Sequence, residues 1–167
     1  MLRAAGMHQW LGATSVPSRD PTARGLISAI AALADAYPQL TAIVNLCDAS
    51  PPLPLSRARA LVAEHSGGHA RVEGDAVPGM KTLFWKLRLT PERTRGVQLV
   101  WLFDADIAVH PASFPLGQVA GILLSTGATM LQPSVRALVH GTHHTFLRVR
   151  PAHMSCLATT AMWVEMQ

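Results

Sequence analysis

Two short apolar runs, at residues 40–46 and 97–103, constrain the fold of this chain more than any other feature of its sequence. The first reads LTAIVNL and the second VQLVWLF, and both are rich in β-branched or aromatic residues. Runs of this kind are typical of strands that are buried on both faces, as they are in parallel sheets. Patterns of helical periodicity separate them. The chain therefore predicts an α/β fold with a mixed, mostly parallel sheet flanked by helices.

Further elements are expected on either side of these runs. Helical spacing of apolar residues predicts four helices, at residues 21–37, 56–65, 79–89 and 116–125. Shorter strand-like segments occur at 128–132 and 161–166. In the third predicted helix, Leu83, Phe84 and Leu87 lie on the arc opposite Lys81 and its basic neighbours, which is typical of an amphipathic helix.

The first twenty residues are expected to form a loose leader, followed by a single domain over residues 21–167. The leader lacks the apolar segment and small-residue cleavage site that define a signal peptide. The longest apolar runs are far shorter than the roughly 20 residues required to span a bilayer, so no membrane span is predicted. The sequence leaves the cellular compartment open.

The composition suits a compact domain. With 49% hydrophobic and 14% charged residues, the chain can close a substantial core, and a domain of this length buries about 70% of its unfolded surface. Its two cysteines do not form a Cys-x-x-Cys pair and are too few for a disulfide scaffold. The net charge of +4 permits an anionic partner, but the basic residues are little clustered, and no nucleic-acid partner is predicted.

Asp104 and Asp106 directly follow the second apolar run and are the strongest candidates for chemistry. At positions i and i+2 of an extended chain, two carboxylates project to the same side, about 6.6 Å apart along the backbone. A divalent cation such as Mg²⁺ or Mn²⁺ would offset their repulsion and take substrate phosphates as further ligands. Sheets of the α/β class also bind ligands beyond the carboxyl ends of their strands. The alternative is a solvated turn, because Asp-x-Asp is common.

Five motifs in a fixed order give the chain a resemblance to a known family. They are Phe84-Trp85-Lys86, Leu89-Thr90-Pro91-Glu92, Trp101-Leu102-Phe103-Asp104-Ala105-Asp106-Ile107, Gln132-Pro133-Ser134 and Trp163-Val164-Glu165-Met166. Together, over roughly residues 40–167, they resemble GT-A-type glycosyltransferases, nearest a eukaryotic branch labelled "lysine-ketoglutarate reductase trans-splicing related". The resemblance implies a partial GT-A, Rossmann-like fold, truncated before the acceptor-binding elements and a further metal-binding histidine. It also makes the secretory pathway a possible compartment.

The same resemblance implies roles for individual residues. Both aspartates of the pair would belong to a metal site, with Asp106 as the direct ligand and Asp104 as a ribose or water-mediated contact. Asp48, at the end of the first apolar run, would contact the nucleoside, although an aspartate that caps a turn is the alternative interpretation. Glu165 would lie near the acceptor and serve as a general base if its pKa and reach suit the acceptor hydroxyl.

Basic side chains are candidates for contact with the diphosphate of a nucleotide sugar. Lys81 and Lys86 precede the aspartate pair, although charges on one arc of an amphipathic helix commonly form a solvated face. The segment between the aspartate pair and Glu165 contains no acidic residue. Within it, Arg148 and Arg150 share one side of an extended stretch and are candidate diphosphate clamps, with plain surface arginines as the alternative.

The same acid-free segment carries side chains that could ligate zinc: His140, His143, His144, His153 and Cys156. Imidazole and thiolate are the preferred zinc ligands, but the spacing does not match a common zinc module. A substrate-facing loop with exposed histidines is the preferred interpretation.

These observations predict a metal-dependent glycosyltransferase-like domain that moves a sugar from a nucleoside diphosphate donor to a hydroxyl acceptor. The metal at Asp106, helped by an arginine, would stabilise the charge that develops on the leaving diphosphate. Two alternatives remain open. One is a catalytically inactive remnant that serves as an interaction module, and the other is a metal-dependent phosphohydrolase that uses the same acidic pair with a water nucleophile.

Overall fold

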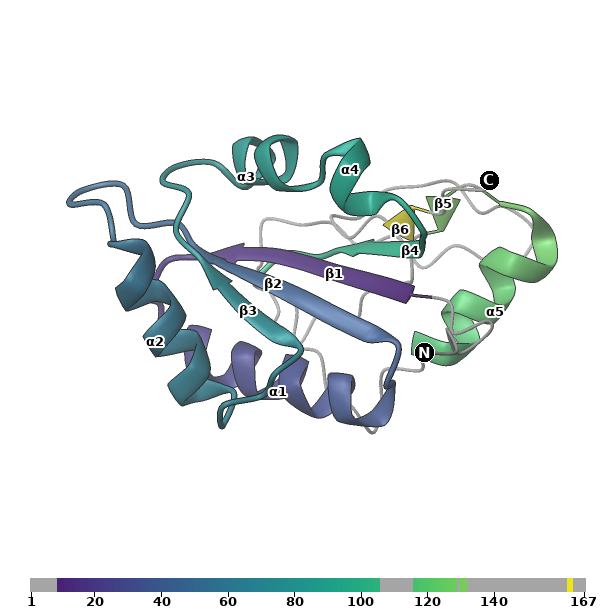
Figure 1. The fold of residues 1–167 in the computed structure, drawn as a ribbon, viewed down its shortest axis with the longest axis horizontal. Coiled ribbons are helices and arrows are strands. Elements are labelled where there is room, and N and C mark those ends of the chain that lie inside the picture. The colour runs from purple at the N-terminus through teal and green to yellow at the C-terminus, as the bar shows by residue number, and fades with distance from the viewer. Residues whose placement is uncertain (1–8, 106–115, 129, 132–161, 164–167) are drawn as a thin grey trace, which may run out of the picture.

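The computed structural model describes residues 9–105, 116–128, 130–131 and 162–163. These residues form a six-stranded sheet with helices packed on both of its faces (Figure 1). The architecture is mixed α/β and Rossmann-like, which confirms the fold class that the alternating sequence pattern predicts.

Four parallel strands make up most of the sheet, and two short antiparallel strands extend it. The four parallel strands are β1 (Gln9–Val16), β2 (Leu40–Leu46), β3 (Val72–Asp75) and β4 (Val97–Leu102). The order across the sheet is β3-β2-β1-β4-β6-β5, where β6 is Met162–Trp163 and β5 is Met130–Leu131. The strands expected from the two apolar runs are confirmed, and β5 and β6 fall inside the two shorter predicted segments.

Four of the helices that the structure describes agree with the predicted ones to within two residues at each end, and the short α4 (Pro91–Thr94) is an additional turn. The four are α1 (Ala23–Ala36), α2 (Leu55–His65), α3 (Lys81–Arg88) and α5 (Leu116–Thr126). A glycine cap ends α2, since Gly67 and Gly68 have φ of 67° and 76° and the Gly68 N–H donates to the Ala63 carbonyl at 2.7 Å.

The N-terminal segment differs from its prediction. Residues 9–16 are not a loose leader but β1, which lies between β2 and β4 and is therefore an interior strand. The small residues of β1 obscure the strand pattern in the sequence. A Cβ on Gly12 would already be 3.6 Å from the ring of Trp101 and 3.7 Å from that of Phe103. These two rings stack with centroids 4.1 Å apart. The large apolar side chains that cover β1 therefore come from β4 and the residue after it, which are distant in the sequence.

Strand β3 is the second element that the sequence pattern does not reveal. It has four residues, VEGD, of which glycine and the two acids are poor strand formers. Its glycine is required by packing, because a Cβ on Gly74 would lie only 2.9 Å from the Ala58 carbonyl oxygen and the Arg59 Cα of α2. The close approach of α2 therefore holds this short strand against the sheet.

The two faces of the sheet carry separate cores. The larger core joins the sheet to α1, α2 and α5, and the smaller joins it to α3, chiefly through the fully buried Phe84. Helix α3 is amphipathic in a different sense from the prediction, since Leu83 and Leu87 are 45% and 48% exposed. The arc of α3 that meets the sheet is instead formed by Lys81, Phe84 and Arg88, because both cations bind buried carboxylates there.

Candidate functional site

The candidate site lies where the parallel strands end. The chain passes from β1 outward to β2 and β3, then crosses to β4 on the opposite side of β1. The carboxyl ends of β1 and β4 therefore flank the point at which the strand order reverses, where open α/β sheets bind their ligands. Backbone contacts join the segments that leave the strands, since the Cys47 N–H donates to the Val16 carbonyl at 3.1 Å and the Gly79 N–H to the Cys47 carbonyl at 3.3 Å.

Asp104 is the buried carboxylate of this site. It follows β4 by two residues and is 7% exposed. Its Oδ1 accepts a hydrogen bond from the Lys81 ammonium, which belongs to the first residue of α3. The Lys81 side chain remains 41% exposed, and its Nζ lies 5.7 Å from the centroid of the Trp85 ring, within the range of a cation–π contact. Lys81 therefore faces both the buried acid and solvent, and it is not part of a plain solvated face.

The turn that precedes α3 places the start of this helix at the site. Gly79 has φ of 90°, a conformation that side chains with a Cβ rarely adopt, and its N–H is bonded to the end of β2. The next turn of the helix is anchored by Phe84. These two contacts position Lys81 at the carboxyl edge of the sheet. Lys86, on the outer arc of α3, is exposed and fits the solvated-face interpretation.

Asp48 lies at the same edge, directly after β2 and Cys47. Both of its carboxylate oxygens accept from the Ser18 N–H, at 3.2 Å each. This contact ties the turn after β1 to the end of β2, in agreement with the interpretation of Asp48 as a carboxylate that closes a turn. The side chain is half-buried, so its role toward a nucleoside stays a prediction.

A buried polar node beside the site was not among the sequence-based candidates. Asn45 is fully buried in β2 and donates to Ser15 Oγ at 2.8 Å and to the Val77 carbonyl at 2.9 Å. Its Oδ1 accepts from the Val77 N–H at 2.6 Å. The signal in the sequence is a lone amide inside an apolar run, which a buried strand tolerates only when the amide is fully bonded. Asn45 thereby fixes the segment that leads from β3 to α3.

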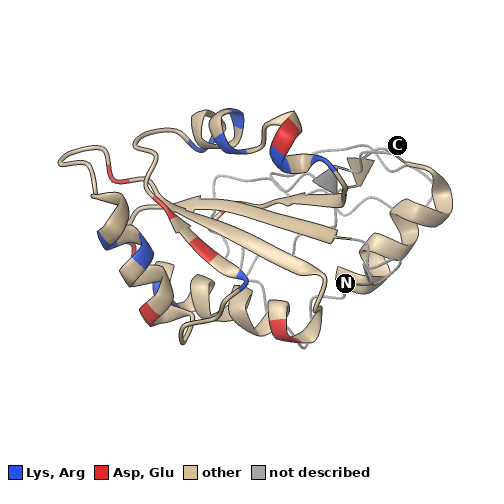
Figure 2. Cartoon of the chain, in the orientation of Figure 1, with Lys and Arg blue, Asp and Glu red and all other residues tan. Residues whose placement is uncertain are grey.

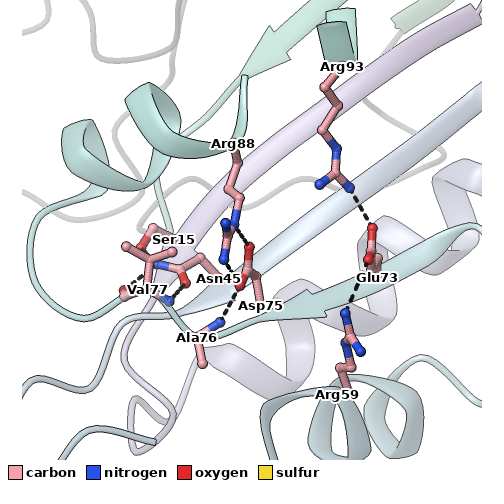
Figure 3. Close-up of polar contacts among 9 residues, drawn as sticks. All are labelled: Ser15, Asn45, Arg59, Glu73, Asp75, Ala76, Val77, Arg88 and Arg93. Atoms are coloured by element: carbon pink, nitrogen blue, oxygen red, sulfur yellow. Dashed lines mark hydrogen bonds and ion pairs between the residues drawn. The ribbon is translucent and has the colours of Figure 1, made fainter. Parts of the chain in front are cut away.

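The other end of α3 carries a second ion pair, with Asp75 at the end of β3. Arg88 donates from Nη2 to Oδ1 at 3.0 Å and from Nε to Oδ2, and the Ala76 N–H donates to Oδ1 at 2.8 Å (Figure 3). Burial by itself would raise the pKa of Asp75, but the hydrogen bonds from Arg88 and Ala76 hold it below the ordinary value. The same contact raises the pKa of Arg88. This pair is a structural clamp between α3 and the sheet.

Strand β3 is also held from both sides through Glu73. Arg93 of α4 donates to Oε2 at 2.6 Å, and Arg59 of α2 lies 3.8 Å from Oε1 (Figure 3). Figure 2 shows the resulting pattern, with basic residues on α2 and on the α3–α4 segment either side of the acidic β3. These charges cover the strand at one margin of the sheet, where an unprotected edge would pair with other chains.

The structure brings together three of the predicted site residues, Asp48, Lys81 and Asp104, at one edge of the sheet. The remaining candidates lie outside the described residues: Asp106, Arg148, Arg150, Glu165 and the histidines and cysteine considered for zinc. Within the part of the chain that is described, no three His, Cys, Asp or Glu side chains come together as a metal-binding group.

Asp104 does not fit the role of a divalent-metal ligand in this arrangement. Its charge is already balanced by the Lys81 ammonium. A divalent cation 4 Å from that ammonium would be repelled by about 8 kcal/mol at an effective dielectric constant of 20. A metal could take this carboxylate only if Lys81 moved away. The metal role of Asp104 therefore stays a prediction that requires a change at Lys81, and Asp106, the predicted direct ligand, lies outside the described residues.

Comparisons with known proteins add nothing to the geometry, because no family model, curated protein or solved structure matches the chain. Among the helices that the structure describes, none is sufficiently long and apolar to cross a membrane.

Proposed function

We propose that this domain binds a nucleoside diphosphate sugar at the carboxyl edge of β1, β2 and β4, and that it transfers the sugar to a hydroxyl acceptor. The observation that carries the proposal is the Lys81–Asp104 pair at the point where the strand order reverses. A cation at this position suits an anionic ligand, and the buried carboxylate keeps that cation in place. The motif order that resembles GT-A enzymes supports the same ligand class.

Each of the three site residues that the structure describes has a role in this proposal. Lys81 binds the diphosphate, since an ammonium is a common phosphate partner and 41% of this side chain remains accessible. Asp104 orients Lys81 and lies within the region expected for the ribose. Asp48 holds the turn after β1 through Ser18 and offers its remaining acceptor capacity to the nucleoside.

The transfer step rests on residues beyond the described part of the chain. Arg148 and Arg150 would neutralise the leaving diphosphate, and Glu165 would accept the proton of the acceptor hydroxyl as the sugar is transferred. By the resemblance, Asp106 would hold a divalent cation that assists departure of the leaving group, whereas binding of the diphosphate would not depend on that cation.

Calorimetric titration with UDP, GDP and their sugar conjugates tests the proposal, first in buffer with Mn²⁺ and then with EDTA. We expect saturable binding of at least one nucleotide by the wild-type chain, and a loss of tenfold or more in Asp104→Asn. The matched control is Asp35→Asn, which alters a carboxylate on α1 that is 73% exposed and distant from the site. Absence of binding to the wild-type chain in both buffers would contradict the proposal.

A binding module without catalytic activity is the second candidate, and the Lys81–Asp104 contact favours it over a phosphohydrolase. A phosphohydrolase that activates water through two metal-bound carboxylates requires Asp104 to be free for the metal, whereas here the carboxylate holds an ammonium. A nucleotide-binding module has no such requirement. Tight nucleotide binding without sugar transfer or release of the sugar to water would identify the binding module.

A further inference from the structure

We infer that the Lys81 ammonium takes the place of a divalent cation at Asp104, so that this chain binds a nucleoside diphosphate without metal. The inference rests on the proposed function and concerns which cation serves the diphosphate. It departs from the prediction of a metal-dependent site, because the structure gives the described member of the Asp-x-Asp pair a different partner.

The fold holds Lys81 in position. Its helix begins at the positive-φ Gly79, whose N–H is bonded to the end of β2. One turn later Phe84 is fully buried, and at the far end Arg88 is clamped to the sheet. Lys81, Phe84 and Arg88 share one arc of α3, so the two other anchors direct Lys81 toward Asp104.

The chemistry of the Lys81 ammonium suits a phosphate ligand. A lysine carries three N–H donors, and one of them is directed to Asp104. With the side chain 41% exposed, the remaining donors can reach a phosphate that approaches from solvent. The Trp85 ring, 5.7 Å from Nζ, limits the directions in which the side chain can turn. Such a restrained ammonium presents N–H donors and one positive charge to a diphosphate at the position where a metal would present two.

The charge of Asp104 is balanced by a neighbouring side chain. The carboxylate side chain is 9% exposed, so its charge requires a nearby cation, and Lys81 meets this requirement. A metal placed on the same carboxylate would meet the ammonium at short range, as derived above. Displacing Lys81 would cost the ion pair and its contact with Trp85 before any metal bond formed.

The test is a set of calorimetric titrations of UDP, GDP and uridine into the wild-type chain, in EDTA and in Mn²⁺. The variants are Lys81→Met, which removes the charge, and Lys81→Arg, which keeps it. The matched control is Lys86→Met, on the exposed arc of the same helix. Circular dichroism melts of all variants confirm that each is folded.

We expect diphosphate affinity in EDTA to remain within threefold of that in Mn²⁺. Lys81→Met should lower UDP or GDP affinity at least thirtyfold while changing uridine affinity less than threefold. Lys81→Arg should stay within fivefold of wild type, and Lys86→Met within twofold. If Lys81→Met fails to fold, two measurements remain: wild-type affinity in EDTA against that in Mn²⁺, and the affinity of Lys81→Arg. These still decide whether diphosphate binding depends on a metal.

Three results would overturn the inference. Binding that appears only with Mn²⁺ would leave the proposed function intact and assign the cation to a metal. Equal losses of affinity for UDP and for uridine in Lys81→Met would show that Lys81 has only a structural role. No binding of any nucleotide in either buffer would remove the proposed function, and the inference with it.

Discussion

The two ends of α3 place a cation on a buried carboxylate of the sheet, but they do so in different ways. At one end Arg88 meets Asp75 through two N–H groups, and the Ala76 N–H adds a third hydrogen bond. At the other end Lys81 meets Asp104 through a single ammonium, and the two cations are similarly exposed, at 38% for Arg88 and 41% for Lys81. The two aspartates are 6% and 7% exposed, so their burial does not account for the difference.

The contrast teaches how one helix can serve both architecture and binding. A planar guanidinium that engages both oxygens of a carboxylate fixes distance and orientation together, whereas an ammonium is a compact charge with rotatable donors. Arg88 therefore anchors α3, and Lys81 presents charge to whatever arrives at the edge of the sheet. The positions agree with this division, because Asp104 adjoins the point of reversed strand order and Asp75 does not.

Removing each cation in turn should give the largest difference in stability between the two ends of α3. Arg88→Met leaves Asp75 buried without its partner, and we expect a loss of about 3 kcal/mol in the free energy of unfolding. Lys81→Met also leaves a buried carboxylate unpaired, but it removes one hydrogen bond instead of two, so its loss should be smaller, about 2 kcal/mol. Urea denaturation of both variants measures the two values. Equal losses, or a larger loss at Lys81, would show that the two ends are not distinct.

The packing that places Asp75 is tested at Gly74. A Cβ there would come within 2.9 Å of backbone atoms of α2, so Gly74→Ala should destabilise the chain by about 2 kcal/mol. Gly25→Ala is the control, because a Cβ at this position of α1 meets nothing within 4 Å. It should be neutral or stabilise the helix by up to about 1 kcal/mol. A Gly74→Ala chain as stable as wild type would refute the close approach.

The acid dependence of stability sharpens the comparison further. Since the folded-state pKa of Asp75 lies below the ordinary value of 3.8, its stabilisation is complete above that pH and is lost as the pH falls through the folded value. Asp75→Asn should therefore be less stable than wild type at pH 7, and its stability should fall less steeply below pH 4. Gly25→Ala, which alters no titratable group, should keep the wild-type slope. Parallel curves for wild type and Asp75→Asn would contradict this account.

The fold could be predicted from the sequence where periodicity carries the signal. The run at residues 40–46 and the helical patterns around it are local features, and the structure confirms them. Strand β1 escapes this reasoning because its small residues are covered by Trp101 and Phe103 of a distant segment. Strand β3 escapes because Gly74 is chosen for its contact with α2 rather than for strand propensity.

The candidate site could be predicted only residue by residue. Asp104 was identifiable from its residue type and its position after a predicted strand. Lys81 was a candidate because of its charge and its place before the aspartate pair, and Asp48 because of the resemblance to GT-A enzymes. The pairing of Lys81 with Asp104, 23 positions apart, could not be predicted, because it depends on how α3 crosses the sheet. A helical wheel assigns Lys81 and Arg88 to the solvent arc. The buried carboxylates reverse that assignment.

An NMR titration of the isotope-labelled chain with UDP and with GDP tests the central claim most directly. The account predicts amide shift changes, from at least one of the two nucleotides, at the Lys81 end of α3 and in the segments after β1, β2 and β4. Signals of Glu73, Asp75 and Arg88 should remain in place. Changes centred on the Arg88 end, or no changes with either nucleotide at saturating concentration, would contradict it.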